Sequence, residues 1–137
     1  MFPTAGLNYM LNVLFGATAK PTDLYIGLVA SENFTGFSDG DTAASHTGWE
    51  EFEDYDESGR VEITFGAASA SSITNPTSIS FTPNANATVY GWFLSTAAGK
   101  GSTSGTLICM GAFAEGPVAV QSGIVQSFLL TINDRNI

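Results

Sequence analysis

The sequence contains few charged residues, and basic residues are the scarcest of them. Only 12% of its 137 residues are charged, and four Lys and Arg against thirteen Asp and Glu give a formal net charge of −9. Nucleic-acid binding needs clustered basic side chains that displace counterions from phosphates. The basic residues here, Lys20, Arg60, Lys100 and Arg135, lie far apart in the sequence. We therefore expect no nucleic-acid partner and, for the same reason, no attraction to an anionic membrane surface.

Cysteine and histidine each occur once. Cys109 cannot form an internal disulfide, and because it lies in the apolar run from Leu107 to Met110 we expect a buried thiol that acts as a small hydrophobe. A zinc site needs three or four His or Cys ligands, so it is excluded. Any His-based catalytic triad would depend on His46. Its neighbours are small and polar, which predicts a solvated loop histidine and a protein that is not an enzyme.

Long apolar runs are also missing. No stretch approaches the roughly 20 apolar residues of a membrane span. The N-terminus has no basic segment before an apolar core, so we expect no secretory signal and predict synthesis in a cytoplasm. The length suits one domain, and the 44% hydrophobic content is enough to build its core.

One segment, from Thr4 to Gly16, has the periodicity of a helix. Thr4 is expected to cap its start, Gly16 to end it, and Pro21 to prevent its continuation. A helix this short is marginal alone, so its apolar stripe must dock onto its own domain or onto a neighbouring subunit. We assign residues 1–20 to an N-terminal helix or arm. The spacing i, i+3, i+4 and i+7 places four apolar residues on one face, namely Leu7, Met10, Leu11 and Leu14.

From residue 21 onward the period changes to two. Leu24, Ile26 and Leu28 share one face of a predicted strand, and similar short runs follow at 61–65, 79–81, 117–120 and 124–132. The runs at 89–94 and 107–113 are apolar on both faces, which predicts central strands. Turn residues separate the runs and no helix intervenes, so a parallel βαβ sheet is excluded. Residues 21–137 are predicted to form an all-β, antiparallel β-sandwich.

The longest irregular stretch covers residues 31–59 and ends in an acidic run from Glu50 to Glu57. Aromatic residues interrupt this run. Trp49 is the better candidate for exposure and for stacking on a sugar, whereas Trp92 lies in an apolar strand and is expected in the core or an interface. A long loop of this kind is often functional.

The sharpest local pattern lies within the acidic run. Its oxygen-bearing side chains at alternate positions, followed by Gly59, match part of a calcium loop, although Phe65 stands where a bidentate Glu is required. Two other interpretations stay open: an acidic turn whose repulsion Arg60 relieves, and a contact patch for a basic partner. The candidate calcium ligands are Asp54, Asp56 and Ser58.

Several segments follow one another in a recognisable order. They are AGLNYMLNVLFG (5–16), LYIGLVA (24–30), GWEEFEDY (48–55), Arg60 with VEITFGAAS (61–69), SITNPTSISFTP (72–83), TVYGWFLS (88–95), an apolar strand through Phe113, and VQSGIVQSFLLTIN (120–133). This order resembles a family of small bacteriophage virion proteins, called head-decoration or cement proteins or tail-fibre-like proteins.

The resemblance implies a sandwich of the jelly-roll type on the head exterior. It implies the major capsid protein and further copies of the chain, as a homodimer or homotrimer, as partners, with no active site and no cofactor. The alternatives are a tail or fibre protein that binds a host-surface glycan through Trp49, and a hydrolase that uses the acidic run. Residues expected at the capsid or oligomer interface are Leu7, Met10, Leu11, Leu14, Phe15, Trp49, Glu50, Glu51, Phe52, Glu53 and Tyr55.

Overall fold

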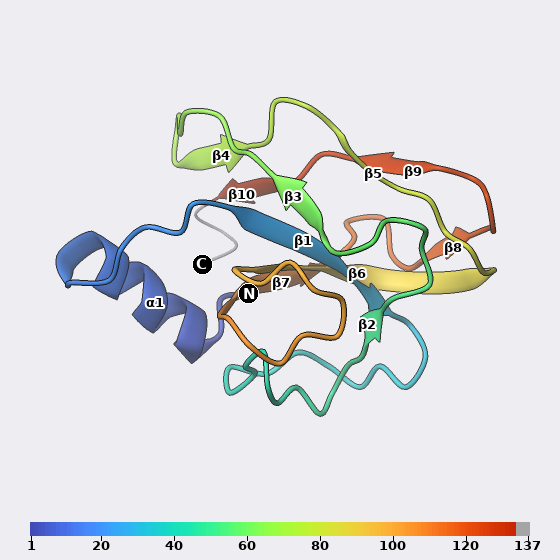
Figure 1. The fold of residues 1–137 in the computed structure, drawn as a ribbon, viewed down its shortest axis with the longest axis horizontal. Coiled ribbons are helices and arrows are strands. Elements are labelled where there is room, and N and C mark those ends of the chain that lie inside the picture. The colour runs from blue at the N-terminus through green and yellow to red at the C-terminus, as the bar shows by residue number, and fades with distance from the viewer. Residues whose placement is uncertain (134–137) are drawn as a thin grey trace.

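The computed structural model describes residues 1–133. Arg135 and the end of the predicted sandwich domain lie outside the described residues. One helix precedes a series of short strands, as Figure 1 shows. The elements are α1 (Thr4–Phe15), β1 (Leu24–Ala30), β2 (Glu51–Phe52), β3 (Val61–Ile63), β4 (Ser72–Thr74), β5 (Ile79–Phe81), β6 (Ala87–Ser95), β7 (Leu107–Ala112), β8 (Val118–Val120), β9 (Gln126–Phe128) and β10 (Thr131–Asn133).

The main sheet has the order β2-β1-β6-β7, and all of its pairs are antiparallel. Strand β1 pairs with β2 through Leu28 and Phe52 and with β3 through Leu24 and Ile63, so β2 and β3 follow one another along the same edge of β1. In the same way, β7 and β8 share the other edge of β6. The long pair formed by β1 and β6 is therefore the centre of the sheet.

Two short antiparallel ribbons, β10-β4 and β5-β9, accompany this sheet. The main core lies between them and the sheet, because Phe81 on β5 clusters with Ile26 and Leu28 on β1. The opposite face of the sheet buries Val29 and Phe93 beneath the loop of residues 31–50 (Figure 1). The alternation of β1 between these two faces follows from the period of two that its sequence predicts.

Most of the predicted strands are confirmed, with two corrections. The run at 107–113 forms β7 but is not central: β7 lies at the end of the strand order, and the N-terminal residues cover its edge, where Met1 and Met110 exchange backbone hydrogen bonds. The run at 124–132 is divided between β9 and β10. Buried Asn75 accounts for the division, because it bonds to both backbone groups of Leu130 between the two strands. The model is consistent with an all-β sandwich that carries one short helix.

Helix α1 begins one residue earlier than a Thr4 cap requires, because Thr4 is already its first helical residue. Pro3 is at the N-cap position and no side-chain cap bond forms, while the backbone N–H of Gly16 bonds to the carbonyl of Asn12 and ends the helix as predicted. The first half of α1 packs against β7. Gly6 permits this contact, because a Cβ there would lie 2.1 Å from the carbonyl oxygen of Ile108.

Gly6→Ala is expected to destabilise the protein by about 1–3 kcal/mol, because the added methyl group pushes α1 away from β7. The intrinsic preference of helices for Ala over Gly, about 1 kcal/mol, acts in the opposite direction, so the sign is informative. Urea denaturation followed by circular dichroism measures the change. Gly40→Ala is the matched control, since its Cβ meets only the Ser38 Oγ at 3.8 Å. Equal or greater stability of Gly6→Ala would contradict the contact.

Candidate interaction surfaces

The acidic run alternates between buried and exposed residues. Phe52 and Tyr55 are 5% and 1% exposed and belong to the main core, whereas Glu50, Glu53 and Asp54 are exposed. The alternation arises because β2 pairs with β1, which turns Phe52 toward the core and its neighbour Glu51 toward the opposite face. The predicted interface roles of Phe52 and Tyr55 are therefore wrong: both side chains are used inside the protein.

Glu51 forms a buried, bidentate ion pair with Arg60. The Arg60 Nε and Nη2 atoms donate to the two carboxylate oxygens at 2.9 and 2.7 Å, and the two side chains are only 4% and 6% exposed. Arg60 also lies over the Phe93 ring, 4.9 Å from its centroid. Glu51 is thus not available to a partner, and Arg60 relieves the acidic repulsion as one of the open alternatives predicted.

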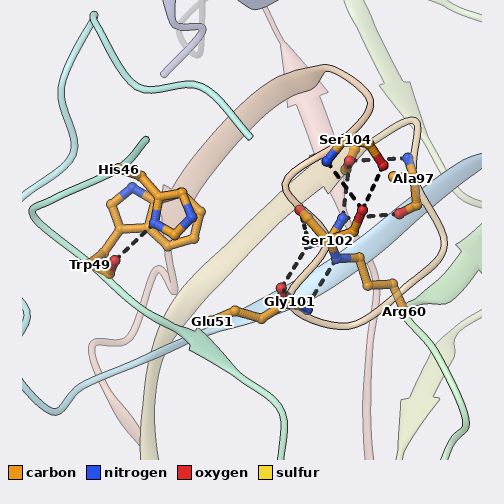
Figure 2. A network of polar contacts seen from close by, with 9 residues as sticks. His46, Trp49, Glu51, Arg60, Ala97, Gly101, Ser102 and Ser104 are labelled. Carbon is orange, nitrogen blue, oxygen red and sulfur yellow. Dashed lines mark hydrogen bonds and ion pairs between the residues drawn. The ribbon is translucent and has the colours of Figure 1, made fainter. Parts of the chain in front are cut away.

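The same arginine fixes the loop between β6 and β7 (Figure 2). Arg60 Nη1 donates to the Ser95 Oγ at 3.2 Å and to the Ala97 carbonyl at 3.0 Å, and Nη2 donates to the Ser102 carbonyl at 3.3 Å. The backbone N–H of Gly101 bonds to Glu51 at 2.8 Å. All of the contacts needed to satisfy a buried guanidinium are therefore present.

Lys100, at the tip of this loop, reaches back to the acidic run. Its ammonium group donates to the backbone carbonyls of Glu53 and Tyr55 and lies 3.7 Å from the centroid of the Tyr55 ring. Burial, and then the nearby Glu51 carboxylate, raise the pKa of Tyr55 well above its ordinary value. These contacts of Lys100 hold the loop between β6 and β7 against the acidic run.

The spacing of a calcium loop does not produce a calcium site. Within residues 1–133, no group of three His, Cys, Asp or Glu side chains is placed to hold a metal ion. The physical reason is that the chain from Asp54 to Asp56 is extended beside residues 82–84: Asn84 donates to the carbonyl of Asp54, and Asp56 donates to that of Thr82. An extended backbone cannot wrap Asp54, Asp56 and Ser58 around an ion.

The exposed carboxylates of this region surround a cleft of about 650 Å³. Residues from the end of β1, from β2 and from the start of β6 line it. Four of its lining residues are exposed acids with no Lys or Arg among the other lining residues. We call this surface the acidic face, and its residues are Glu32, Glu50, Glu53 and Asp54.

Trp49 is buried, which corrects the expectation that it is exposed. It is 3% exposed, its Nε1 donates to the carboxylate of buried Asp41 at 2.9 Å, and its ring packs beside Phe93. His46 is half-buried rather than solvated: its ring stacks on Trp49, 4.0 Å between centroids, and Nδ1 donates to the Trp49 carbonyl (Figure 2). Trp49 can therefore offer no open platform for a sugar.

The predicted apolar stripe of α1 divides between two roles. Leu7 and Met10 are half-buried against the main core. The later residues extend beyond the sheet (Figure 1) and are exposed: Leu11 by 55%, Leu14 by 72% and Phe15 by 80%. We call Leu11, Leu14 and Phe15 the helix end. The sequence predicted these three as interface residues, and the structure leaves them available to a partner.

A second apolar surface, which the sequence did not indicate, lies at the opposite end of the molecule. It is a groove of about 470 Å³ between β6, β8 and β9. Leu129 is 59% exposed at its rim, and Ile124 and Val125 nearby are 53% and 56% exposed. We call it the apolar groove, and its apolar lining includes Leu28, Val89, Phe113, Val118, Val120, Phe128 and Leu129.

Most of the residues that contact Arg60 could not be identified from the sequence. Ser95, Ala97 and Ser102 contact Arg60 from 35 to 42 residues away, and no local pattern marks them. Asp41 carried a weak signal, because an acid in a loop that also contains a Trp can accept from the indole N–H.

Comparison with protein-family models and with curated proteins finds no match for the chain. Within residues 1–133, no helix combines the length and apolarity that crossing a membrane requires. The surfaces described above are therefore the observations from which a function can be inferred.

Arg60→Met is expected to cost about 3–5 kcal/mol of unfolding free energy, because it leaves the buried Glu51 carboxylate without a partner. Adding Glu51→Met should recover a large part of that loss, since no buried charge then remains. Urea titration of the single and double variants, with Lys20→Met as an exposed control, measures both effects. A double variant no more stable than Arg60→Met would contradict the pairing.

Cys109 is expected to resist thiol reagents in the folded protein. It is 1% exposed, as the sequence predicted, and burial raises the pKa of its thiol to about 12, so almost no thiolate exists near pH 8. Labelling with a chromogenic disulfide at increasing urea should follow the unfolding curve. Rapid labelling without urea would contradict the packing of β7.

Proposed function

We propose that the chain is a non-enzymatic structural protein of a bacteriophage virion, a decoration or cement protein that binds the outer surface of the head. The observation that carries this proposal is the exposure of large apolar side chains at two ends of a chain with few charges. Apolar surfaces that cluster in this way mark contacts with other proteins. The family resemblance in the order of the sequence segments supplies the particular assembly.

The acidic face is the surface that we assign to the capsid. Its carboxylates are exposed, and the pairing of Glu51 with Arg60 and the contacts of Lys100 fix the backbone that presents them. A rigid surface loses little conformational entropy on binding. Its partner would be a basic region of the major capsid protein, since complementary charge guides docking and fixes orientation.

The mechanism would be stabilisation by mass action. A protein that binds the assembled shell, and not its separated subunits, lowers the free energy of the shell. Repetition over symmetric sites adds these contributions. No cofactor or catalytic group takes part in this mechanism, and the sandwich would have the jelly-roll form that the resemblance implies.

A glycan-binding tail or fibre protein is the rival that the sequence left open. It depended on an exposed Trp49, and the buried position of that side chain removes its main support. The hydrolase alternative depended on the acidic run, in which Glu51 is paired with Arg60 and Glu50, Glu53 and Asp54 are exposed. Neither arrangement is the enclosed, unpaired carboxyl that a general acid needs. Particles that carry the protein only on the tail would favour the glycan-binding rival over the head assignment.

The triple variant Glu50→Gln, Glu53→Gln, Asp54→Asn is expected to bind heads about tenfold more weakly, because each lost rim contact contributes up to about 1 kcal/mol. Binding of the unaltered protein should also weaken as salt is added, since exposed charge pairs are screened. Co-sedimentation with DNA-filled heads lacking the protein measures both.

The control carries the same change of charge elsewhere on the surface, in Asp23→Asn, Asp39→Asn and Glu62→Gln, all at exposed positions. It should bind as the unaltered protein does. Equal weakening in both variants would mean that net charge matters and the acidic face does not. No co-sedimentation of the unaltered protein would contradict the proposal itself.

A further inference from the structure

The helix end belongs to a long segment without charge. Residues 1–19 contain no charged side chain, and the first is Lys20. Within this segment the most exposed large side chains, Leu14 and Phe15, lie in the last turn of α1, where the helix has passed beyond the sheet (Figure 1). The result is a convex apolar projection that no described part of the same molecule covers.

The apolar groove is the concave counterpart. Its floor consists of core residues, since Leu28, Val89 and Val120 are each at most 4% exposed yet line it. The groove thus marks a place where the β5-β9 ribbon and the main sheet do not close over the core. Phe128, packed on Phe81 with 5.7 Å between ring centroids, forms the ribbon side.

Charge identifies the occupant of this groove. Residues 116–133 contain no charged side chain, and Glu115 is the only charged residue in the groove lining. Two copies of a chain with a net charge of −9 repel one another across most of their surfaces. The helix end and the groove are two surfaces through which copies can meet with Glu115 as the one carboxylate at the contact. A basic partner would instead favour the acidic face.

We propose that the helix end of one copy docks into the apolar groove of the next copy. This contact deepens the proposed function, and its place in a virion rests on that function. α1 extends to one end of the long axis in Figure 1, whereas β8 and β9, which line the groove, lie toward the other end, so one molecule cannot join its own two surfaces. The contact is heterologous, and such contacts repeat into a closed ring or an open chain.

Two variants separate the halves of this contact. Leu14→Glu with Phe15→Glu alters the helix end, and Leu129→Glu alters the groove rim. All three positions are more than half exposed, so the fold should tolerate the changes, and thermal unfolding checks this. Ala68→Glu, on the exposed loop before β4, adds charge away from both surfaces as a control. Sedimentation velocity without any capsid gives the oligomeric state.

The unaltered protein and Ala68→Glu should form oligomers, increasingly so as salt screens the repulsion between copies. Each of the two interface variants should be monomeric. When mixed, they should form a dimer and nothing larger, because the intact helix end of the Leu129→Glu protein still fits the intact groove of the other variant. A contact in which both copies use the same patch would not be restored by mixing, because one of the two patches would always carry the substitution.

Three results would overturn the proposal: a monomeric unaltered protein at high salt, an interface variant that still forms oligomers, or a mixture that stays monomeric. These outcomes are independent of head binding. If oligomers form as expected but heads are not bound, the proposed function fails and the self-contact stands. If the protein is monomeric and still binds heads, the proposed self-contact fails and the proposed function stands.

Discussion

The guanidinium of Arg60 is shared between the Glu51 carboxylate, the last residue of β6 and two positions on the loop between β6 and β7. This single buried cation joins the sheet edge at β2, the end of β6 at Ser95 and the loop at Ser102. Because both members of the ion pair are removed from water, each depends on the other, and a partner lost on either side leaves an uncompensated charge. The position of the exposed carboxylates on the acidic face follows from this constraint.

The distribution of charge gives the molecule two kinds of surface. The acidic face surrounds the cleft beside β2, whereas the segments 1–19 and 116–133 contain no charged side chains. Charged surfaces act over distance and are weakened by salt, while apolar ones act on contact and are not. A protein built into an ordered array can use the first to find its shell and the second to meet its neighbours.

The sequence predicted those features that depend on neighbouring residues. The alternation of Ile26 and Leu28 fixed the faces of β1, and the spacing of Leu7 and Met10 located the packed half of α1. Prediction failed where the partner is distant. Nothing near Trp49 in the sequence shows that Phe93 will pack against its ring.

The acidic run is a second case in which distant partners decide which side chains are buried. Phe52 and Tyr55 were expected at an interface, yet the pairing of β2 with β1 turns Phe52 inward, and the contact with residues 82–84 does the same for Tyr55. The end of α1 was predicted as an interface because a short helix must dock its apolar stripe, and the structure leaves Leu11, Leu14 and Phe15 exposed. The apolar groove could not be predicted, since it exists only where two layers of the fold fail to meet.

Electron cryomicroscopy of the intact particle tests the central claim most directly. We expect density for this chain on the exterior of the head, with the acidic face against the capsid and the helix end of each copy in contact with the next. Density confined to the tail tip, or to the interior of the head, would contradict it.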